Sequence, residues 1–163
     1  MRTEISRLSL ALLAMSACAS PAPVATTATF DPQDPAVTAA LDSIVALSRD
    51  GANNADADAA MAPLNVDDQL TYMGADLILT GKERIRGAFR DTYAQVRRQA
   101  YAPIGRQVRL IAPDIVIYSG IGKGSYQDKD GKVSDPVYIG MSGVFVRRDG
   151  VWRLVHIQQS FVQ

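Results

Sequence analysis

The sequence has few of the residues that build covalent or metal-centred sites. Its 163 residues include one cysteine and one histidine. A single cysteine cannot form a disulfide within the chain, and one histidine without a second thiol cannot build an ordinary zinc site. We therefore expect the protein to work without a metal ion and without a cofactor.

The chain also lacks an excess of charge of either sign. Seventeen basic residues balance seventeen acidic residues, and no long basic block is present. Nucleic acids and anionic membrane surfaces attract proteins through a positive surface, so neither is an expected partner. The overall composition of the chain, with 47% hydrophobic and 21% charged residues, is typical of one globular domain.

The N-terminal apolar run, residues 8–15, is too short to span a bilayer. Two arginines precede it and small residues follow it, which is the order of a bacterial signal peptide. Residues 15–18, Met-Ser-Ala-Cys, resemble a lipobox, and Ala19 after them resembles the sorting pattern of Gram-negative outer-membrane lipoproteins. The resemblance implies a cell-envelope lipoprotein whose acylated Cys18 holds it on the periplasmic side of the outer membrane. Ordinary signal cleavage after Ala19 is the alternative.

A tether follows the predicted signal peptide of residues 1–18. Residues 19–34 are rich in proline, alanine and threonine and have neither helical nor strand periodicity, which predicts a disordered linker. The folded domain is predicted to span residues 35–163. The N-terminal lipid anchor is then the expected attachment to the membrane.

Three segments in the first half of the domain carry apolar residues at helical spacing. The first begins at Pro35, a residue suited to a first helical turn. The second is short and is capped by Asp56 or Asp58. The third follows Gly81 and extends to Val96, with several arginines on its solvent face.

The second half of the domain is predicted to be a sheet. Four runs are rich in β-branched and aromatic residues, and a weaker strand precedes them at residues 70–73. The glycines of residues 120–124 lack the spacing of a phosphate-binding loop and predict a bulge or a bend. Three helices before a long antiparallel sheet predict an α+β fold with the helices on one face. The four runs are residues 108–111, 115–126, 137–147 and 151–161.

The pair Asp149-Gly150 predicts a two-residue hairpin turn between the last two strands. Counting back from this turn fixes which side chains share a face. One face is predicted to carry Ile139, Met141, Gly143, Phe145, Leu154, His156, Gln158 and Ser160. The other is predicted to carry Val144, Val146, Val155, Ile157 and Phe161, and this apolar face predicts a homodimer that pairs through the sheet.

The ordered motifs resemble the nuclear transport factor 2-like superfamily, and particularly its SnoaL-like members. An acidic pair leads into Tyr-Met-Gly within residues 67–74, and Leu-Thr-Gly-Lys-Glu at residues 79–83 opens a helix. The ending, residues 149–160, is similar to the closing pattern Trp-x-Ile-x-His-x-His-x-Ser of that group, with Gln158 where a second histidine is common. The resemblance covers roughly residue 35 to the C-terminus.

The resemblance implies a cystatin-like fold, in which a cone-shaped, strongly bent antiparallel sheet packs on three N-terminal helices around a cavity. Members of the superfamily include isomerases, dehydratases, epoxide hydrolases and secretion-system components, so the fold alone does not decide the function. Members also commonly pair through the sheet, which agrees with the predicted homodimer.

The predicted register and the resemblance together give the candidate ligand-binding residues. The tyrosine, the tryptophan and the histidine each have a structural alternative. The histidine is either an acid/base or ligand-contacting residue, or a structural residue held by a hydrogen bond. The tryptophan and the tyrosine can instead be packed core residues. Asp67 and Asp68, before the first strand, are interpreted as turn or cap residues. The candidates are Tyr72, Met141, Trp152, His156, Gln158 and Ser160.

Three functions remain open. The first is a cavity that binds a small, largely apolar molecule, as a mixed face with a few polar groups indicates. The second is a cofactor-free lyase, isomerase or hydrolase that uses His156 as general acid/base. The third is an envelope assembly module that docks through its sheet. Binding leads, because no carboxylate shares the predicted face with His156.

Overall fold

The computed structural model describes residues 31–74 and 76–162, so Cys18, the predicted signal peptide and most of the predicted tether lie outside the described residues. Helix α1 (Pro35–Asn53) begins where the sequence predicts. The carboxylate of Asp34 caps it by accepting the backbone N–H of Ala36 at 2.8 Å. Contact with the sheet starts slightly earlier, since the N–H of Leu110 donates to the carbonyl of Pro32 at 3.0 Å.

The second helix, α2 (Ala57–Met61), is capped by Asp56 and continues into a short 3-10 turn, η1 (Ala62–Leu64). It packs closely on α1 at Gly51. A Cβ atom at Gly51 would lie 2.3 Å from the backbone nitrogen of Ala60, so the two helix backbones touch where only glycine fits.

The third helix, α3 (Lys82–Tyr93), is shorter than predicted. Its expected extension to Val96 is wrong, because Val96 begins strand β3 (Val96–Gln99), which pairs with β6 (Tyr126–Asp128) in a small second sheet. The apolar side chain at this position lines the cavity described below instead of continuing the helical stripe.

The main sheet has six strands in the order β2-β1-β8-β7-β5-β4. Neighbours are antiparallel except β1 and β8, which are parallel. All four predicted strand runs are present, although the second ends at Gly124 and the chain then enters β6. Strand β2 was not predicted. The strands are β1 (Thr71–Met73), β2 (Ile78–Thr80), β4 (Ala102–Ala112), β5 (Ile115–Gly124), β7 (Val137–Arg148) and β8 (Val151–Val162).

The predicted irregularity at the glycines of β5 is present. The ladder between β4 and β5 shifts register between Pro103 and Gly105, opposite Ile121 and Gly122. Beyond it, a Cβ atom at Gly124 would lie 2.2 Å from the carbonyl oxygen of Ala100, so the chain entering β4 crosses directly over this glycine. This crossing brings the β3–β4 connection to the end of the sheet that carries β6.

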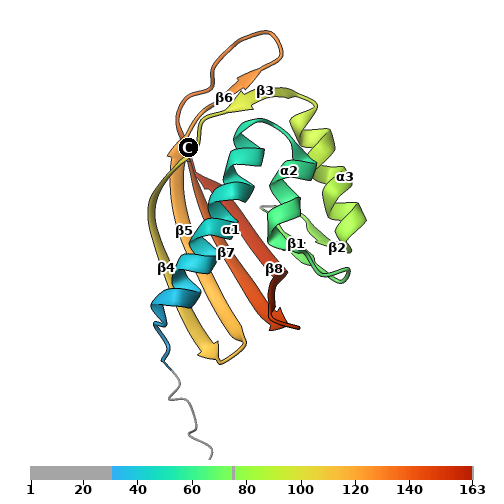
Figure 1. Cartoon of the computed structure of the whole chain (residues 1–163). Coiled ribbons are helices and arrows are strands. Elements are labelled where there is room, and N and C mark those ends of the chain that lie inside the picture. The colour runs from blue at the N-terminus through green and yellow to red at the C-terminus, as the bar shows by residue number, and fades with distance from the viewer. Residues whose placement is uncertain (1–30, 75, 163) are drawn as a thin grey trace, which may run out of the picture.

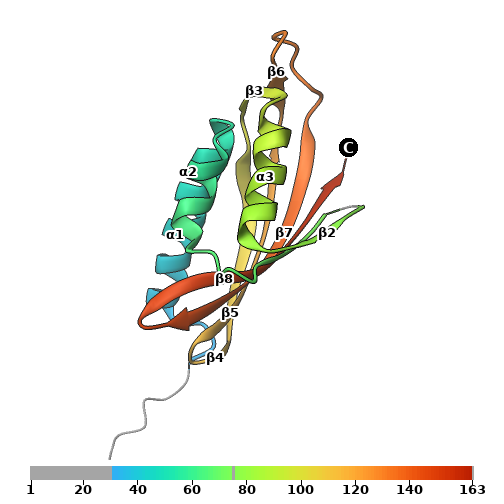
Figure 2. The ribbon, with the colours of Figure 1, turned by 90° about the vertical axis from the view of Figure 1, so that its right-hand side faces the viewer.

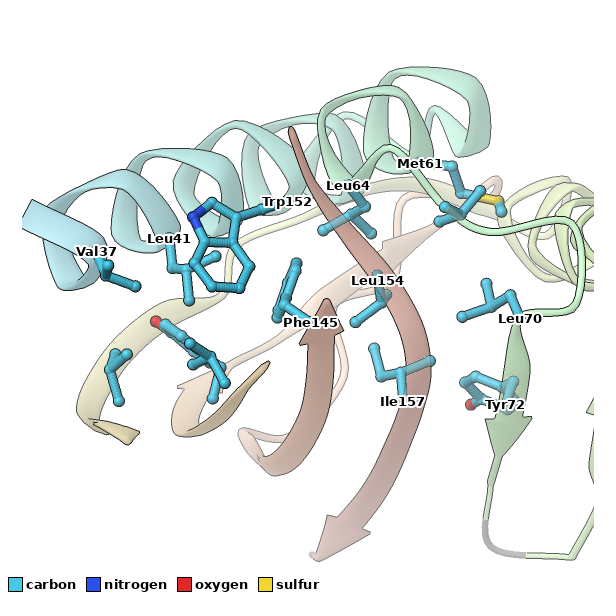
Figure 3. Packing of buried hydrophobic residues seen from close by; sticks show 14 of the residues in the cluster. Val37, Leu41, Met61, Leu64, Leu70, Tyr72, Phe145, Trp152, Leu154 and Ile157 are labelled. Atoms are coloured by element: carbon cyan, nitrogen blue, oxygen red, sulfur yellow. The ribbon is translucent and has the colours of Figure 1, made fainter. Parts of the chain in front are cut away.

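The helices lie on one face of a strongly curved sheet, which confirms the predicted α+β architecture (Figures 1 and 2). We call this face the inner face and the opposite one the outer face. The core lies between α1 and the inner face, where Trp152 packs beside Leu41, and Phe145 and Leu154 approach from β7 and β8 (Figure 3). Within the described residues, no helix is long and apolar enough to cross a membrane.

Candidate ligand-binding cavity

A β-bulge at Val155 decides which residues of β8 face the helices. The hairpin pairs Arg148 with Val151 and Phe145 with Leu154, as predicted. The next pair is Val144 with His156, so Val155 is the extra residue and the predicted pairing of Gly143 with His156 is wrong. One added residue reverses the faces of every side chain that follows it.

The reversal exchanges the faces of the β8 side chains that follow Val155, while the β7 side chains keep their predicted faces. Ile157 and Gln159 lie on the inner face, opposite Gly143 and Met141, and Phe161 follows them. The physical gain is hydrophobic: the bulge lets Ile157 join Leu154 in the core, where it is 6% exposed. A regular ladder would divide these apolar side chains between the two faces.

A cavity of about 930 Å³ lies between the inner face and the helices, at the end of the domain that carries β3 and β6. Every layer of the domain contributes to its wall: the last turns of α1 and α3, helix α2, the small β3–β6 sheet, and the ends of β7 and β8. Six of the lining residues are aromatic, namely Tyr72, Phe89, Tyr93, Tyr101, Tyr126 and Phe161.

Three of these rings form a continuous row. The Tyr72 and Phe89 rings meet edge to face with centroids 5.4 Å apart, and Phe89 stacks on Tyr93 at 6.1 Å. Tyr72 comes from β1 and the other two come from successive turns of α3. The row fixes the inner surface of α3 against the sheet and gives the cavity an aromatic wall.

Polar groups are few and are held in place. The Tyr72 hydroxyl donates to Oε1 of Gln159 at 3.3 Å. The Gln99 amide donates to the carbonyl of Ala52 at 2.8 Å, and Asn53 exchanges hydrogen bonds of 3.1 and 3.0 Å with the backbone of Tyr101. The bonds of Gln99 and Asn53 tie the β3–β4 connection to the end of α1, and residues of both segments line the cavity.

The hydroxyls of Tyr72, Tyr93 and Tyr101 are neutral hydrogen-bonding groups at physiological pH. Burial raises the pKa of Tyr72, and the nearby Asp76 carboxylate raises it further. Burial also raises the pKa of Tyr93, against the opposing effect of its hydrogen bond with Gln99. The pKa of Tyr101 is raised for the same main reason. The cavity therefore offers hydroxyl donors without phenolate charge.

The structure does not bring the six predicted ligand-binding residues into one cavity. Tyr72 lines it, Met141 lines a smaller neighbouring cavity, and Trp152 is a core residue. His156, Gln158 and Ser160 lie on the outer face because of the bulge. These three side chains are absent from the linings of both cavities.

His156 has a structural partner on the outer face. Its Nδ1 lies 2.7 Å from Oγ1 of Thr71, its neighbour on the parallel strand β1. The part of the chain that the structure describes contains no cluster of three or more histidine, cysteine, aspartate or glutamate side chains that could hold a metal ion.

Asp67 stabilises the turn that precedes β1. The carboxylate of Asp67 accepts the backbone N–H of Gln69 at 2.8 Å and pairs with Arg148 at 2.5 Å. The first of these bonds lowers the pKa of Asp67 most, and the nearby charge of Arg148 lowers it further. Asp68 and Asp76 are exposed and do not line the cavity.

The outer face is more polar than the sequence predicts. Val144 and Val146 belong to it, as expected, but the bulge moves Ile157 and Phe161 to the inner face. Ser119 and Ser142 also lie on the outer face, with their hydroxyl oxygens 3.4 Å apart. The apolar set that predicts a homodimer therefore loses two of its five residues.

The family comparison agrees with this architecture. Residues 37–163 match the SnoaL-like domain. The chain belongs to the SnoaL-like domain family. No curated protein matches it in sequence. The match confirms the family that the motifs of the sequence resemble.

Solved structures share the SnoaL-like fold at low sequence identity. A ketosteroid isomerase-like protein from Erwinia carotovora atroseptica SCRI1043 is 19% identical, with a TM-score of 0.66 over 77% of this chain and 95% of that one. The hexachlorocyclohexane dehydrochlorinase LinA-type3 from Novosphingobium barchaimii LL02 is 14% identical, with a TM-score of 0.68 over 78% and 88%. The association domain of C. elegans CaMKII is 17% identical, with a TM-score of 0.60 over 77% and 95%. These similarities establish the fold and leave the function open.

Sequence reasoning missed most of the cavity. The predicted register placed Ile157 and Phe161 on the opposite face, and Gln159 was not among the candidates. Tyr93, Tyr101 and Tyr126 lie on elements that come together only in the folded chain. The one available indication was the spacing of large apolar residues in β8, since a single bulge after Leu154 places Trp152, Leu154, Ile157 and Phe161 on one face.

Proposed function

We propose that this SnoaL-like domain binds a small, largely apolar molecule in the cavity between its helices and the inner face of the sheet. The observation that carries the proposal is the cavity itself, about 930 Å³ with six aromatic side chains in its wall. Cavities of roughly 300–1,000 Å³ with apolar walls and a few fixed polar groups are typical of small-molecule sites. The tyrosine hydroxyls and side-chain amides supply those polar groups.

Catalysis by His156 has no support from the geometry. A general acid/base must reach the reacting atoms within hydrogen-bond distance or through one water. His156 bonds to Thr71 on the outer face, and the cavity wall contains no histidine. The carboxylates of the wall, Asp128 and Asp130, come from β6 and the turn that follows it. Binding therefore remains the leading function.

The proposal is tested by filling the cavity from α1. Ser48 lines the cavity, whereas its neighbour Leu47 is exposed on the other side of the same helix. We expect Ser48→Trp to lower the affinity for N-phenyl-1-naphthylamine, an uncharged aromatic probe, at least about tenfold, which corresponds to about 1.4 kcal/mol. Fluorescence titration of the full chain measures it.

The control Leu47→Trp adds the same indole without entering the cavity, so its affinity should stay within about twofold of the unmodified chain. His156→Gln should also leave the affinity unchanged, because His156 lies on the outer face. Equal losses in Ser48→Trp and Leu47→Trp, or no probe binding by the unmodified chain, would count against the proposal.

The location proposed for this binding protein is the cell envelope. The predicted lipobox ending at Cys18 supports a lipid anchor, which would hold the domain on the periplasmic side of the outer membrane. Mass spectrometry of the mature N-terminus is expected to find acylated Cys18. An unmodified chain that begins at Ser20 would contradict the anchor.

We also retain the homodimer as part of the proposal. Val144 and Val146 form an apolar centre on the outer face. Among similar folds, the CaMKII domain is named for association, which is consistent with pairing in this fold. Docking of another envelope protein on the same face, as an assembly module, has no separate observation in its favour.

A further inference from the structure

Arg49 occupies an unusual position on α1. It lies four residues after Val45 and three before Ala52, on the stripe of α1 that faces the cavities. The solvent side of the helix carries residues such as Leu47 and Asp50, which are exposed. The Arg49 side chain is only 35% exposed. Placing a guanidinium in a half-buried position costs free energy unless it has polar partners.

Arg49 also lines a second cavity. This cavity, about 360 Å³, lies between α1 and the strands β4 and β5. It shares three lining residues with the main cavity, namely Arg49, Tyr101 and Ile139. Arg49 therefore stands at the junction of the two cavities, within reach of a molecule that occupies either one.

The charge of Arg49 is weakly compensated. Among the described residues its ion pair is with Asp50, its neighbour in the chain, at 3.3 Å. The Asp50 side chain is 62% exposed. An ion pair of this kind contributes little, since water screens it and both side chains lose freedom in forming it.

The other cations near the two cavities differ from Arg49. Arg106 lines the smaller cavity and is held by Asp42 through two hydrogen bonds of 2.7 and 2.6 Å. Lys129 lines the main cavity from the turn after β6, where it is exposed and water screens its charge. Among the lining cations of the two cavities, Arg49 is thus the half-buried one that is not held by two hydrogen bonds to a carboxylate from another element.

We propose that Arg49 binds the acidic group of an amphipathic organic acid whose apolar body fills the main cavity. The proposal rests on the binding function proposed above and gives the chemical class of the ligand. A guanidinium holds a carboxylate or sulfonate through two parallel hydrogen bonds, and partial exclusion of water strengthens the pair. Tyr101 lines both cavities, and its neutral hydroxyl is a further donor proposed for the same group.

Two matched probes test the proposal in the full chain. 8-Anilinonaphthalene-1-sulfonate and N-phenyl-1-naphthylamine share one aromatic body and differ in the sulfonate. We expect the unmodified chain to bind the sulfonate probe more tightly. Arg49→Gln should lower affinity for the sulfonate probe at least about tenfold and change affinity for the uncharged probe less than about twofold. Arg49→Lys, which keeps the charge, should recover part of the loss.

Arg109→Gln is the control, because Arg109 is an exposed arginine of β4 outside both cavities, and it should leave both affinities unchanged. Equal affinities of the unmodified chain for the two probes, or equal effects of Arg49→Gln on both, would overturn the role of Arg49. These outcomes can be distinguished from failure of the proposed binding function. If that function is wrong, Ser48→Trp leaves the affinity for the uncharged probe unchanged. The comparison of the two probes uses the unmodified chain, so it tests the proposal even if a variant folds poorly.

Discussion

Replacement of Phe145 by alanine is expected to lower the free energy of unfolding by about 3–5 kcal/mol, the usual cost of removing a buried phenylalanine. Phe145 lies on β7 and is 0% exposed. Its ring packs between the sheet and α1, beside Leu41 and Trp152 (Figure 3). Removal leaves a cavity that this tightly packed core cannot fill. Urea denaturation at equilibrium measures the loss.

Phe161→Ala is the matched control for this variant. Phe161 lies in the wall of the cavity and is 52% exposed, so we expect a loss of about 1 kcal/mol or less. The two substitutions remove the same atoms and differ in the burial of the ring. Equal losses in the two variants would contradict the placement of the core between α1 and β7.

The bulge at Val155 predicts a second large effect. Ile157→Ala is expected to lower the free energy of unfolding by about 2–5 kcal/mol, because Ile157 lies on the inner face with 6% of its surface exposed. His156→Ala should cost about 0.5–1.5 kcal/mol, the typical contribution of one hydrogen bond, here with Thr71.

The order of these two losses tests the register of β8. A regular ladder would bury His156 and expose Ile157, and the histidine variant would then be the less stable of the two. The same urea denaturation measures both variants, with circular dichroism to verify that each retains the native secondary structure.

Most of the fold could be predicted from local features of the sequence. Apolar residues at helical spacing predicted where α1 and α2 begin, with Pro35 in the first turn of α1 and either Asp56 or Asp58 as the cap of α2, of which the structure uses Asp56. The pair Asp149-Gly150 predicted the last hairpin and its pairing as far as Phe145 and Leu154. In each of these cases the deciding interactions join residues close together in the chain.

The bulge and the cavity depend on contacts between distant segments. The bulge at Val155 is favourable because it buries the apolar side chain of Ile157, which a regular ladder would leave on the outer face. That burial requires α1 and β1 to be in place. The aromatic wall likewise needs α3 beside β1 for Phe89 to meet Tyr72. Spacing within β8 alone could not rank these alternatives.

The smaller errors have the same origin. Val96 extends the apolar stripe of α3 in sequence, yet it forms β3 because β6 offers it a partner strand more than two dozen residues later in the chain. Arg49 was overlooked because a single charge beside Asp50 on a helix usually belongs to its solvent face. Only the packing of α1 on the sheet shows that Arg49 faces the cavities.

The side-chain amides of two neighbouring glutamines provide the most direct test of the central claim, that the ligand enters the cavity on the inner face. Gln159 lines the cavity and accepts the Tyr72 hydroxyl, whereas Gln158 is exposed on the outer face. Nuclear magnetic resonance of the isotope-labelled full chain, titrated with N-phenyl-1-naphthylamine, is expected to shift the Gln159 side-chain signals and leave those of Gln158 in place. Shifts at Gln158 and His156 with none at Gln159 would contradict both the cavity and the register that builds it.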